Sequence, residues 1–362
     1  MNTLRNFDIE VVPIDVRSSR DKFIVDSVAL PLTAIGLARR GIHAGLDRER
    51  RVAQQSMLLS RARSRAGREL LEHHGAVDGI IQIGTGYDLG HPNTISYEDM
   101  TIPQALDWPE TFWGDVPRRM VRPRVRQQSF AYQRQRGAAF CTSWAAESAV
   151  AQLGCPPDKA HVVGIGANFL TARRLERDWS TPRFFFAGRE WSRKNGPMVL
   201  EAFAEVQRAF PQAELHLAGH HPRIEQPGVI DHGHLDLSDL DDRAEMLDLW
   251  QTSTCCVVPS RFEPAGIIYV EAMHAGIPSI GTRNGGAADI IGDAGVAVDP
   301  SDLDELTRAM LAYSDPVVAA TVGARAQRRS AEYTWERVTT ALLGALGSSR
   351  VGVPETDEDH LQ

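Results

Sequence analysis

The chain has 362 residues, of which 43% are hydrophobic and 24% are charged, and its formal net charge at pH 7 is −8. This composition supplies enough apolar surface for two folded domains, which argues against a largely disordered chain, and the negative charge argues against nucleic-acid binding. Because it has no run of 18 apolar residues and no secretory pattern in its first ten residues, we expect a cytoplasmic protein.

Charge is distributed unevenly along the chain. Residues 1–150 hold 20 basic and 17 acidic residues, a net +3, whereas residues 151–362 hold 19 and 30, a net −11. Only 3 of the cations are lysines against 36 arginines, a bias that suggests a GC-rich bacterial genome. Lys194 therefore stands out as a compact point charge of the kind that suits a phosphate site.

The first half of the chain is expected to form an α/β domain. Strands are expected over residues 7–15, 79–84, 93–99 and 138–142, and a long basic helix over about residues 47–73. The run GTGYDLG at residues 84–90 resembles a dinucleotide fingerprint, but Pro92 follows it in place of a helix. No acidic residue is placed to bind a ribose either, so we do not expect a nicotinamide cofactor.

The stretch of residues 118–136 contains seven arginines and no acidic residue. Such a segment attracts an anionic membrane surface or a phosphorylated acceptor, or it forms only a solvated face, and the sequence leaves these alternatives open. In the first case the protein would lie peripherally on the inner face of the membrane.

The second half alternates short apolar strands with helices, which is typical of a parallel sheet covered on both faces. Strands are expected over residues 183–188, 214–219, 255–260, 278–282 and 295–300, and helices over about 199–210, 239–251, 266–275 and 301–314. We therefore expect a doubly wound domain whose ligands lie beyond the carboxyl ends of its strands.

A loop at that edge, residues 260–266, contains a candidate ligand site. It leaves a strand and enters a helix, so the backbone N–H groups of Gly266, Ile267 and Ile268 form a potential anion site. Glu263 beside them suits sugar hydroxyl groups, because a carboxylate accepts hydrogen bonds from hydroxyls.

Three further features converge on the same edge. Glu271 lies one turn inside the helix, where it suits a vicinal diol, and Arg189 and Lys194 follow the first strand of this half, where they suit phosphate oxygens. Residues 283–286, with the sequence RNGG, enter the next helix and offer more backbone N–H groups. Together these features predict a nucleotide-sugar site.

Three segments resemble a known family in order and spacing: residues 184–203 (FFFAGREWSRKNGPMVLEAF), 256–291 (CVVPSRFEPAGIIYVEAMHAGIPSIGTRNGGAADII) and 333–338 (YTWERV). They are similar to the donor domain of retaining glycosyltransferases of family 4, which have the GT-B fold: two Rossmann-like doubly wound domains that face each other across a cleft. The resemblance covers about residues 160–345. Its specific element is the pair Glu263 and Glu271, with seven residues between them, and an arginine and a lysine upstream.

The resemblance implies a role for each site residue. Arg189 and Lys194 would neutralise the donor diphosphate, Glu271 would bind the ribose, Glu263 would touch the donor sugar, Gly266, Ile267 and Ile268 would offer backbone amides, and Gly233, His234 and Leu235 would lie near the base. The reaction would be metal-independent and retaining, with a UDP- or GDP-sugar as donor and a small-molecule, glycan or lipid-linked acceptor. No cofactor is expected.

The chain also departs from the family pattern. Ala265 stands where the family usually has phenylalanine. The first domain of the family normally begins with a strand and a glycine-rich loop, and nothing before residues 7–15 supplies them, so either the chain is short at its start or that loop is absent. Glu98 and Asp99 end a strand that commonly ends in histidine, so they are candidates for the acceptor side. These departures leave open an alternative: a non-catalytic relative that binds a nucleotide sugar.

The resemblance and the polar stretch 171–182 together suggest the domain organisation. Residues 1–168 would form the acceptor domain and 169–334 the donor domain. Residues 335–348 would form a helix that returns toward the first domain, and 349–362 a disordered tail.

Other candidate metal and redox groups are better explained as structural. His220, His221, His232 and His234 gather at one sheet edge, but the sequence reveals no carboxylate partners at ligand spacing. The strings DLDD at 239–242 and DLDE at 302–305 open helices, where acids act as caps. Cys141, Cys155, Cys255 and Cys256 are expected to be reduced core residues.

Overall fold

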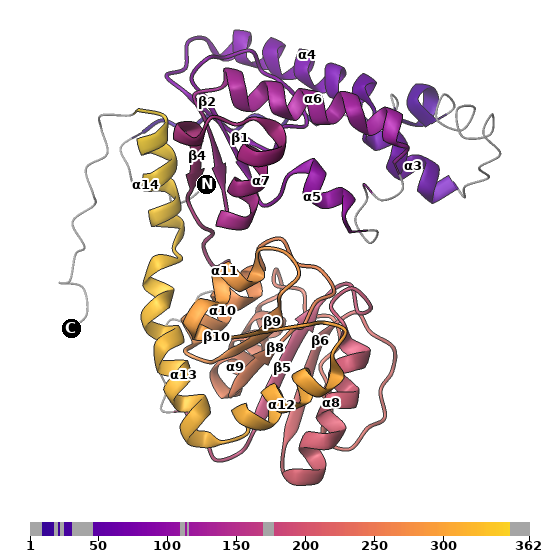
Figure 1. Ribbon diagram of the computed structural model, residues 1–362, viewed down its shortest axis with the longest axis vertical. Coiled ribbons are helices and arrows are strands. Elements are labelled where there is room, and N and C mark those ends of the chain that lie inside the picture. Colours follow the sequence, from indigo (N-terminus) through magenta and orange to yellow (C-terminus); the bar gives the residue numbers. More distant parts are fainter. Residues whose placement is uncertain are drawn as a thin grey trace. The chain divides into compact units, whose positions relative to one another are not determined.

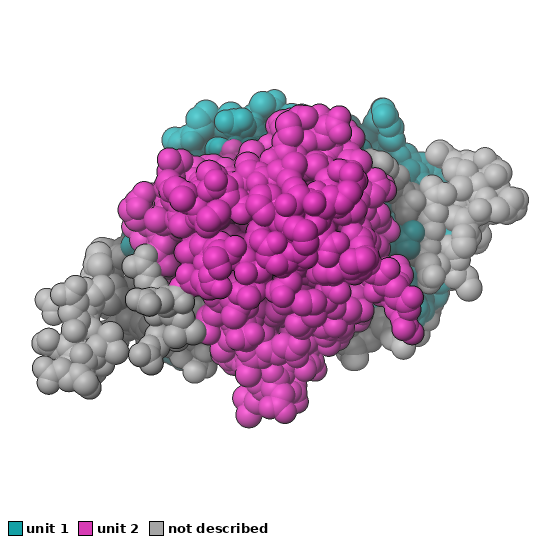
Figure 2. Space-filling view, turned by 90° about the horizontal axis from the view of Figure 1, so that it is seen from below, with its two compact units in different colours: residues 1–163, 339–362 teal, residues 164–338 magenta. Residues whose placement is uncertain are grey.

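The computed structural model describes residues 9–17, 21, 25–30, 46–108, 113, 116–168 and 177–347. The chain divides into two compact units, which Figure 2 colours separately: unit 1 is residues 1–163 with 339–362, and unit 2 is residues 164–338. The expected tail, 349–362, and part of the polar stretch 171–182 lie outside the described residues.

Unit 1 contains a four-stranded parallel sheet in the order β1-β2-β3-β4. Its strands are β1 (Ile80–Ile83), β2 (Thr94–Glu98), β3 (Gly137–Phe140) and β4 (Ala160–Val162). Its helical segments are η2 (Val25–Ala29), α3 (Leu46–Gln54), α4 (Met57–His74), α5 (Ile102–Leu106), α6 (Arg118–Arg134), α7 (Ser143–Leu153) and η3 (Pro157–Lys159).

Two expectations for unit 1 are wrong. No strand forms over residues 9–15, the described part of the expected first strand, because Pro13 interrupts the apolar run and has no N–H for a sheet ladder. The expected long helix is two helices, since the chain turns at Ser56, whose hydroxyl accepts the Leu59 N–H at 3.3 Å and caps α4. The sequence also did not predict the edge strand β4.

The arginine-rich stretch forms α6, which packs against α4, α5 and α7. Val121, Arg124, Gln128 and Tyr132 face inward, while most of its arginines lie on the exposed side. None of the helices in the described part of the chain combines the length and apolar character needed to cross a bilayer.

Unit 2 contains a six-stranded parallel sheet in the order β10-β9-β8-β5-β6-β7 (Figure 1). Its strands are β5 (Arg183–Gly188), β6 (Glu214–Gly219), β7 (Val229–Asp231), β8 (Cys255–Val257), β9 (Ser279–Thr282) and β10 (Gly295–Val298). Its helical segments are α8 (Gly196–Ala209), α9 (Leu240–Thr252), α10 (Ile267–Ala275), α11 (Ala287–Ile291), η4 (Gly292–Ala294), α12 (Leu303–Tyr313), α13 (Pro316–Arg329) and η5 (Ser330–Glu332); α14 (Trp335–Ala345) contributes to both units.

The strand order of unit 2 is that of a Rossmann sheet, which confirms the doubly wound expectation. The chain moves outward from β5 to β7, returns to β8 on the other side of β5, and moves outward again to β10. Helices α8 and α12 pack together, and α10 packs with α9, α11 and α13 (Figure 1). The switch point of the sheet, where such folds bind ligands, therefore lies between β5 and β8.

The core of unit 2 explains why these segments fold as expected. The strand residues Phe184, Phe185 and Phe186 are fully buried, and Trp250 of α9 meets the Phe185 ring edge-on, with ring centroids 4.9 Å apart. The five strands expected from apolar runs all form: β8 and β9 are buried throughout, β5 and β6 are buried at their central apolar residues, and β10 is only partly buried. The sequence did not predict β7 or α13, since β7 is short and partly exposed.

Candidate functional site

Two loops meet at the switch point of unit 2. Lys194 lies in the loop after β5 and Glu263 in the loop after β8, and the Lys194 ammonium forms an ion pair with the Glu263 carboxylate. Both side chains are largely buried, with exposed fractions of 13% and 11%. The Ser260 hydroxyl donates to the same carboxylate oxygen at 3.3 Å, and the Arg193 guanidinium lies 3.6 Å from it. Glu263 is thus enclosed by a hydroxyl and two cations.

The backbone of Glu263 is fixed by the loop after β9. Its N–H donates to the Asn284 carbonyl at 3.0 Å, and its own carbonyl accepts the Gly286 N–H at 3.1 Å. Gly285 between them has a φ of 105°, and a Cβ there would lie 2.1 Å from the Glu263 carbonyl oxygen. The glycine in RNGG is therefore required for this close approach.

Helix α10 presents an uncapped N-terminus beside Glu263. Gly266 is its N-cap residue, with a φ of 86°, and because it has no side chain it makes no capping hydrogen bond to the first turn. A Cβ at Gly266 would lie 2.4 Å from the Tyr269 ring and 3.0 Å from Glu263 Cγ. The positive end of the helix is thus available for an anion.

Glu271 lies on α10 and is partly exposed between the buried residues Val270 and Ala272. Burial raises the pKa of the Cys256 thiol, with the Glu271 charge adding to this effect and the Lys194 charge opposing it. Glu271 and Lys194 therefore both act electrostatically on the same residue of β8.

Arg189 follows directly after β5 and is exposed. It makes no hydrogen bond or ion pair with the residues that the structure describes, so it is not joined to the Lys194–Glu263 pair. Sequence reasoning overlooked its neighbour Arg193, which does reach Glu263. The available signal was that Arg193 directly precedes Lys194 in a loop already assigned to the site.

The segment 233–235, expected near the base, leaves β7 at the same edge of the sheet. The Gly219 N–H donates to the Gly233 carbonyl at 2.7 Å, which ties the segment to the end of β6. The His234 ring stacks on His220 with centroids 4.4 Å apart, and Leu235 is buried.

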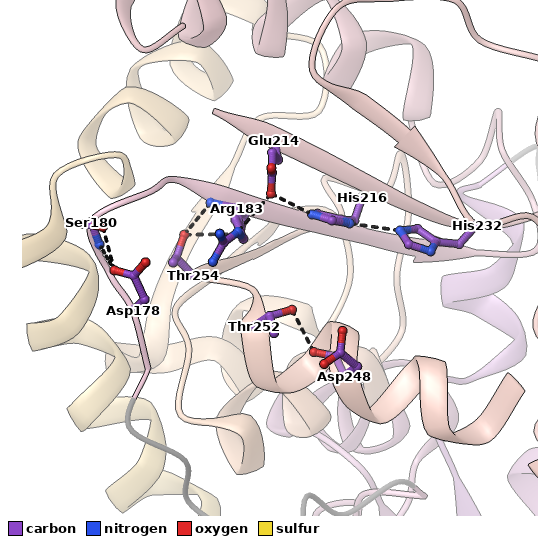
Figure 3. A network of polar contacts seen from close by, with 9 residues as sticks. All are labelled: Asp178, Ser180, Arg183, Glu214, His216, His232, Asp248, Thr252 and Thr254. Carbon is purple, nitrogen blue, oxygen red and sulfur yellow. Dashed lines mark hydrogen bonds and ion pairs between the residues drawn. The ribbon is translucent and has the colours of Figure 1, made fainter. Parts of the chain in front are cut away.

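Two histidines, His216 of β6 and His232 directly after β7, belong to a polar network, drawn in Figure 3, that begins at the first residues of β5 and β6. Arg183 pairs with Glu214 at 2.9 Å, Glu214 lies 3.3 Å from His216, and His216 contacts His232 at 2.9 Å. His232 in turn contacts Glu245 at 2.6 Å.

These contacts bear on whether the histidines of this part of the sheet could hold a metal ion. Burial lowers the pKa of His216. The sequence did not single out His216 and did not reveal the carboxylate partners. Within the described ranges, no group of three or more His, Cys, Asp or Glu side chains is arranged to hold a metal ion.

The acidic strings act as helix caps, as predicted. The Asp239 carboxylate accepts the backbone N–H groups of Asp241 and Asp242 at the start of α9, at 2.9 and 3.2 Å. Asp302 accepts the Glu305 N–H at 2.8 Å at the start of α12. All four cysteines are free and buried, which also confirms the expectation.

The acceptor candidates in unit 1 differ from each other. Asp99 is exposed, whereas the Glu98 carboxyl group is enclosed although the residue as a whole is partly exposed. It accepts hydrogen bonds from Tyr132 at 2.9 Å, Gln128 at 2.8 Å and Thr85 at 3.2 Å. Burial raises the pKa of Glu98 to about 7, against the opposing effect of these hydrogen bonds.

Two α/β units with parallel sheets, one of them in the Rossmann order, define the GT-B class of fold, and the protein has this fold. Residues 181–316 match the family described as Glycosyl transferases group 1. Glycogen synthase of Mycobacterium tuberculosis (strain CDC 1551 / Oshkosh) is 30% identical over 173 residues, which cover 43% of this chain. The chain spans only 40% of the length of that relative.

Solved structures agree on the fold. Sucrose-phosphate synthase from Thermosynechococcus elongatus gives a TM-score of 0.55 at 18% identity, covering 77% of this chain and 69% of its own. The Anabaena protein HepE, solved in complex with UDP and glucose, gives 0.53 at 18% identity, covering 70% and 71%.

Proposed function

We propose that this protein is a retaining glycosyltransferase of family 4 that transfers a sugar from a UDP- or GDP-sugar to an acceptor. The observation that carries the proposal is the pairing of Lys194 with Glu263 at the Rossmann switch point, beside the uncapped N-terminus of α10. A cation, a carboxylate and free helix N–H groups there match the diphosphate and the sugar of such a donor. The family match of residues 181–316 supports the same class of reaction.

Each part of the donor has a proposed partner. Arg189, Lys194 and the N–H groups of Gly266, Ile267 and Ile268 bind the diphosphate; Glu271 binds the ribose hydroxyls; Glu263 contacts the donor sugar; Gly233, His234 and Leu235 lie near the base. Two cations and a helix end match the negative charge of a diphosphate. Carboxylates match hydroxyl groups, to which they act as acceptors.

The proposed reaction needs no metal ion. The bond between the anomeric carbon and the diphosphate breaks, and the acceptor hydroxyl bonds to that carbon on the same face. The acceptor proton passes to the departing phosphate oxygen. Arg189, Lys194 and the α10 N-terminus stabilise the charge that develops on the leaving group.

The proposed acceptor is a small molecule, a glycan or a lipid-linked molecule. Glu98 and Asp99, at the end of β2, are the proposed acceptor-side residues of unit 1. We further propose that the exposed arginines of α6 contact an anionic membrane surface on the cytoplasmic side.

Donor binding is tested first by thermal shift with UDP-, GDP- and ADP-sugars. A donor at a hundred times its dissociation constant should stabilise the fold by about 2.7 kcal/mol. Transfer is then tested by adding acceptor extracts and measuring the release of nucleoside diphosphate. Release that depends on the acceptor supports the enzyme, whereas binding without transfer supports the non-catalytic alternative.

The two glutamates give a sharper prediction, because they are assigned to different parts of the donor. Glu271→Ala should weaken the binding of free nucleoside diphosphate and of nucleotide sugar equally, by roughly ten- to a hundredfold, since the ribose is common to both ligands. Glu263→Ala should not weaken nucleoside diphosphate binding, because Lys194 then gives up no ion pair to bind the diphosphate, and it should reduce turnover and sugar discrimination. Calorimetry with both ligands on both variants checks this, with thermal melts to verify folding. Equal losses for the two ligands in Glu263→Ala would show that its assignment to the sugar is wrong.

A further inference from the structure

The lysine at the switch point has two possible binding partners, a carboxylate of the protein and the phosphates of the donor. In the ligand-free chain Lys194 pairs with Glu263, and both side chains are largely buried. In the proposed function Lys194 binds the donor diphosphate. When it turns to the phosphates, Glu263 loses its nearest cation, and a buried carboxylate without a counter-charge is unstable and takes up a proton.

Arg193 is placed to supply the missing charge. Its guanidinium lies 3.6 Å from the same Glu263 oxygen that Lys194 contacts. One terminal nitrogen donates to the Phe262 carbonyl at 3.0 Å, and Nε donates to Glu190 at 2.9 Å. These two contacts do not involve Lys194, so they hold the guanidinium in place whether or not Lys194 moves.

The backbone of Arg193 adds a further constraint. Its carbonyl accepts the Arg261 N–H at 2.8 Å, so the loop after β5 and the loop after β8 are joined by backbone and side chain of a single residue. The Asn284 side chain holds the opposite side of that second loop, donating to the Arg261 carbonyl at 2.9 Å. Arg193 therefore cannot follow a ligand without breaking the link between the loops.

We propose that Arg193 is a positioning residue that keeps Glu263 ionised and in place while Lys194 transfers from Glu263 to the donor diphosphate. This rests on the proposed function. Arg189 and Arg193 then have different roles: Arg189, exposed and unbonded within the described chain, contacts the ligand, and Arg193 acts through Glu263.

Proton uptake on ligand binding tests the proposal. In Arg193→Gln, the departure of Lys194 leaves Glu263 without a cation, so UDP or GDP binding at pH 7.5 should be accompanied by an uptake of about one proton more than in the wild type. Calorimetry in two buffers of different ionisation enthalpy measures that proton. Arg193→Lys should restore the wild-type value, and Arg193→Gln with Glu263→Gln should abolish the extra uptake.

The matched controls are two other arginines. Arg208→Gln, exposed on α8, should change neither affinity nor proton uptake. Arg189→Gln should weaken nucleoside diphosphate binding about tenfold without proton uptake, because it removes a ligand contact. If Arg193→Gln binds UDP or GDP with the same proton uptake as the wild type, the proposal is wrong.

A measurement without ligand separates this proposal from the proposed function. Lys194→Met imitates the departure of the lysine, and with Arg193 present its free energy of unfolding should change between pH 5.5 and 8 by the same amount as that of the wild type. Adding Arg193→Gln should make the free energy of unfolding fall more than in the wild type over that range, because the folded state then holds a proton on Glu263 that the unfolded state has lost. Adding Glu263→Gln as well should remove this extra fall. Absence of the extra fall in the double variant contradicts the role of Arg193, whereas failure of every nucleotide to bind the wild type contradicts only the proposed function.

Discussion

At the carboxyl end of β2, the Glu98 carboxyl group is enclosed by Thr85, Gln128 and Tyr132, and burial raises its pKa to about 7 from an ordinary value of 4.5. Between these two pH values the folded state holds a proton that the unfolded state has lost. The free energy of unfolding therefore falls as pH rises through this range, by about 3 kcal/mol in total at 1.36 kcal/mol for each unit of pKa shift.

Glu98→Gln should remove this pH dependence, because glutamine has nearly the shape of the protonated acid but cannot ionise. We expect the variant to gain up to about 3 kcal/mol relative to the wild type at pH 8 and little at pH 5. Urea unfolding at the two pH values measures the difference. Glu72→Gln, exposed on α4, is the control and should have the same effect at both. If Glu98→Gln is not more stable than the wild type at pH 8, then Glu98 ionises in the folded protein without lowering the free energy of unfolding.

At the scale of elements, α6 has two unlike faces. Its exposed face carries Arg118, Arg119, Arg122, Arg126 and Arg134, together with Phe130, which is 50% exposed. The Arg134 guanidinium lies over the Phe130 ring, 4.8 Å from its centroid. A row of arginines beside an exposed aromatic ring fits an anionic bilayer surface, whereas the inward face only builds the unit.

If α6 contacts a membrane, Arg119→Gln, Arg122→Gln and Arg126→Gln together should weaken binding to anionic phosphatidylglycerol vesicles about a hundredfold, since each arginine near such a surface contributes about 1 kcal/mol. Vesicle sedimentation at low and high salt measures the loss. A charge-matched control replaces Arg308, Arg325 and Arg328 of unit 2, which are also exposed. Equal binding by the two triple variants would instead favour a merely solvated face.

At the scale of the whole molecule, the charge at the proposed donor site contrasts with the net charge of the chain. Residues 151–362 are strongly acidic, yet Arg189, Arg193 and Lys194 all lie in the loop after β5, and two of them, Arg193 and Lys194, reach Glu263 close to the N-terminus of α10. This local positive field is the basis for expecting a reaction without a metal ion.

Transfer activity and nucleoside diphosphate binding should therefore survive EDTA. The measurement is the rate of diphosphate release, before and after chelation, with the purified full chain. Loss of turnover that Mg²⁺ or Mn²⁺ restores would contradict the proposal. The acidic residues near the histidine network, such as Glu214 and Glu245, would then become candidates for ligands.

Local signals in the sequence were enough for much of unit 2. Short apolar runs predicted five of its strands, because a strand buried on both faces must be apolar throughout. Acidic residues at the starts of the expected helices predicted the caps at Asp239 and Asp302. Such a prediction succeeds because a cap is a contact between residues that are close in the sequence. The same signals failed at the short, partly exposed β7 and at residues 9–15, where Pro13 opposes the apolar pattern.

The sequence by itself determined which residue types stand in the loops after β5 and β8, and hence the nucleotide-sugar hypothesis. The tertiary structure alone decided that Lys194 meets Glu263, 69 residues away, that Arg193 reaches the same carboxylate, and that the Glu98 carboxyl group is enclosed. The physical reason is that periodicity and capping report contacts within a few residues, whereas these contacts depend on which strands become neighbours. The chain returns from β7 to place β8 beside β5, and this brings the two loops together. The order of the strands depends on burying the whole sheet, which no single segment of the sequence reveals.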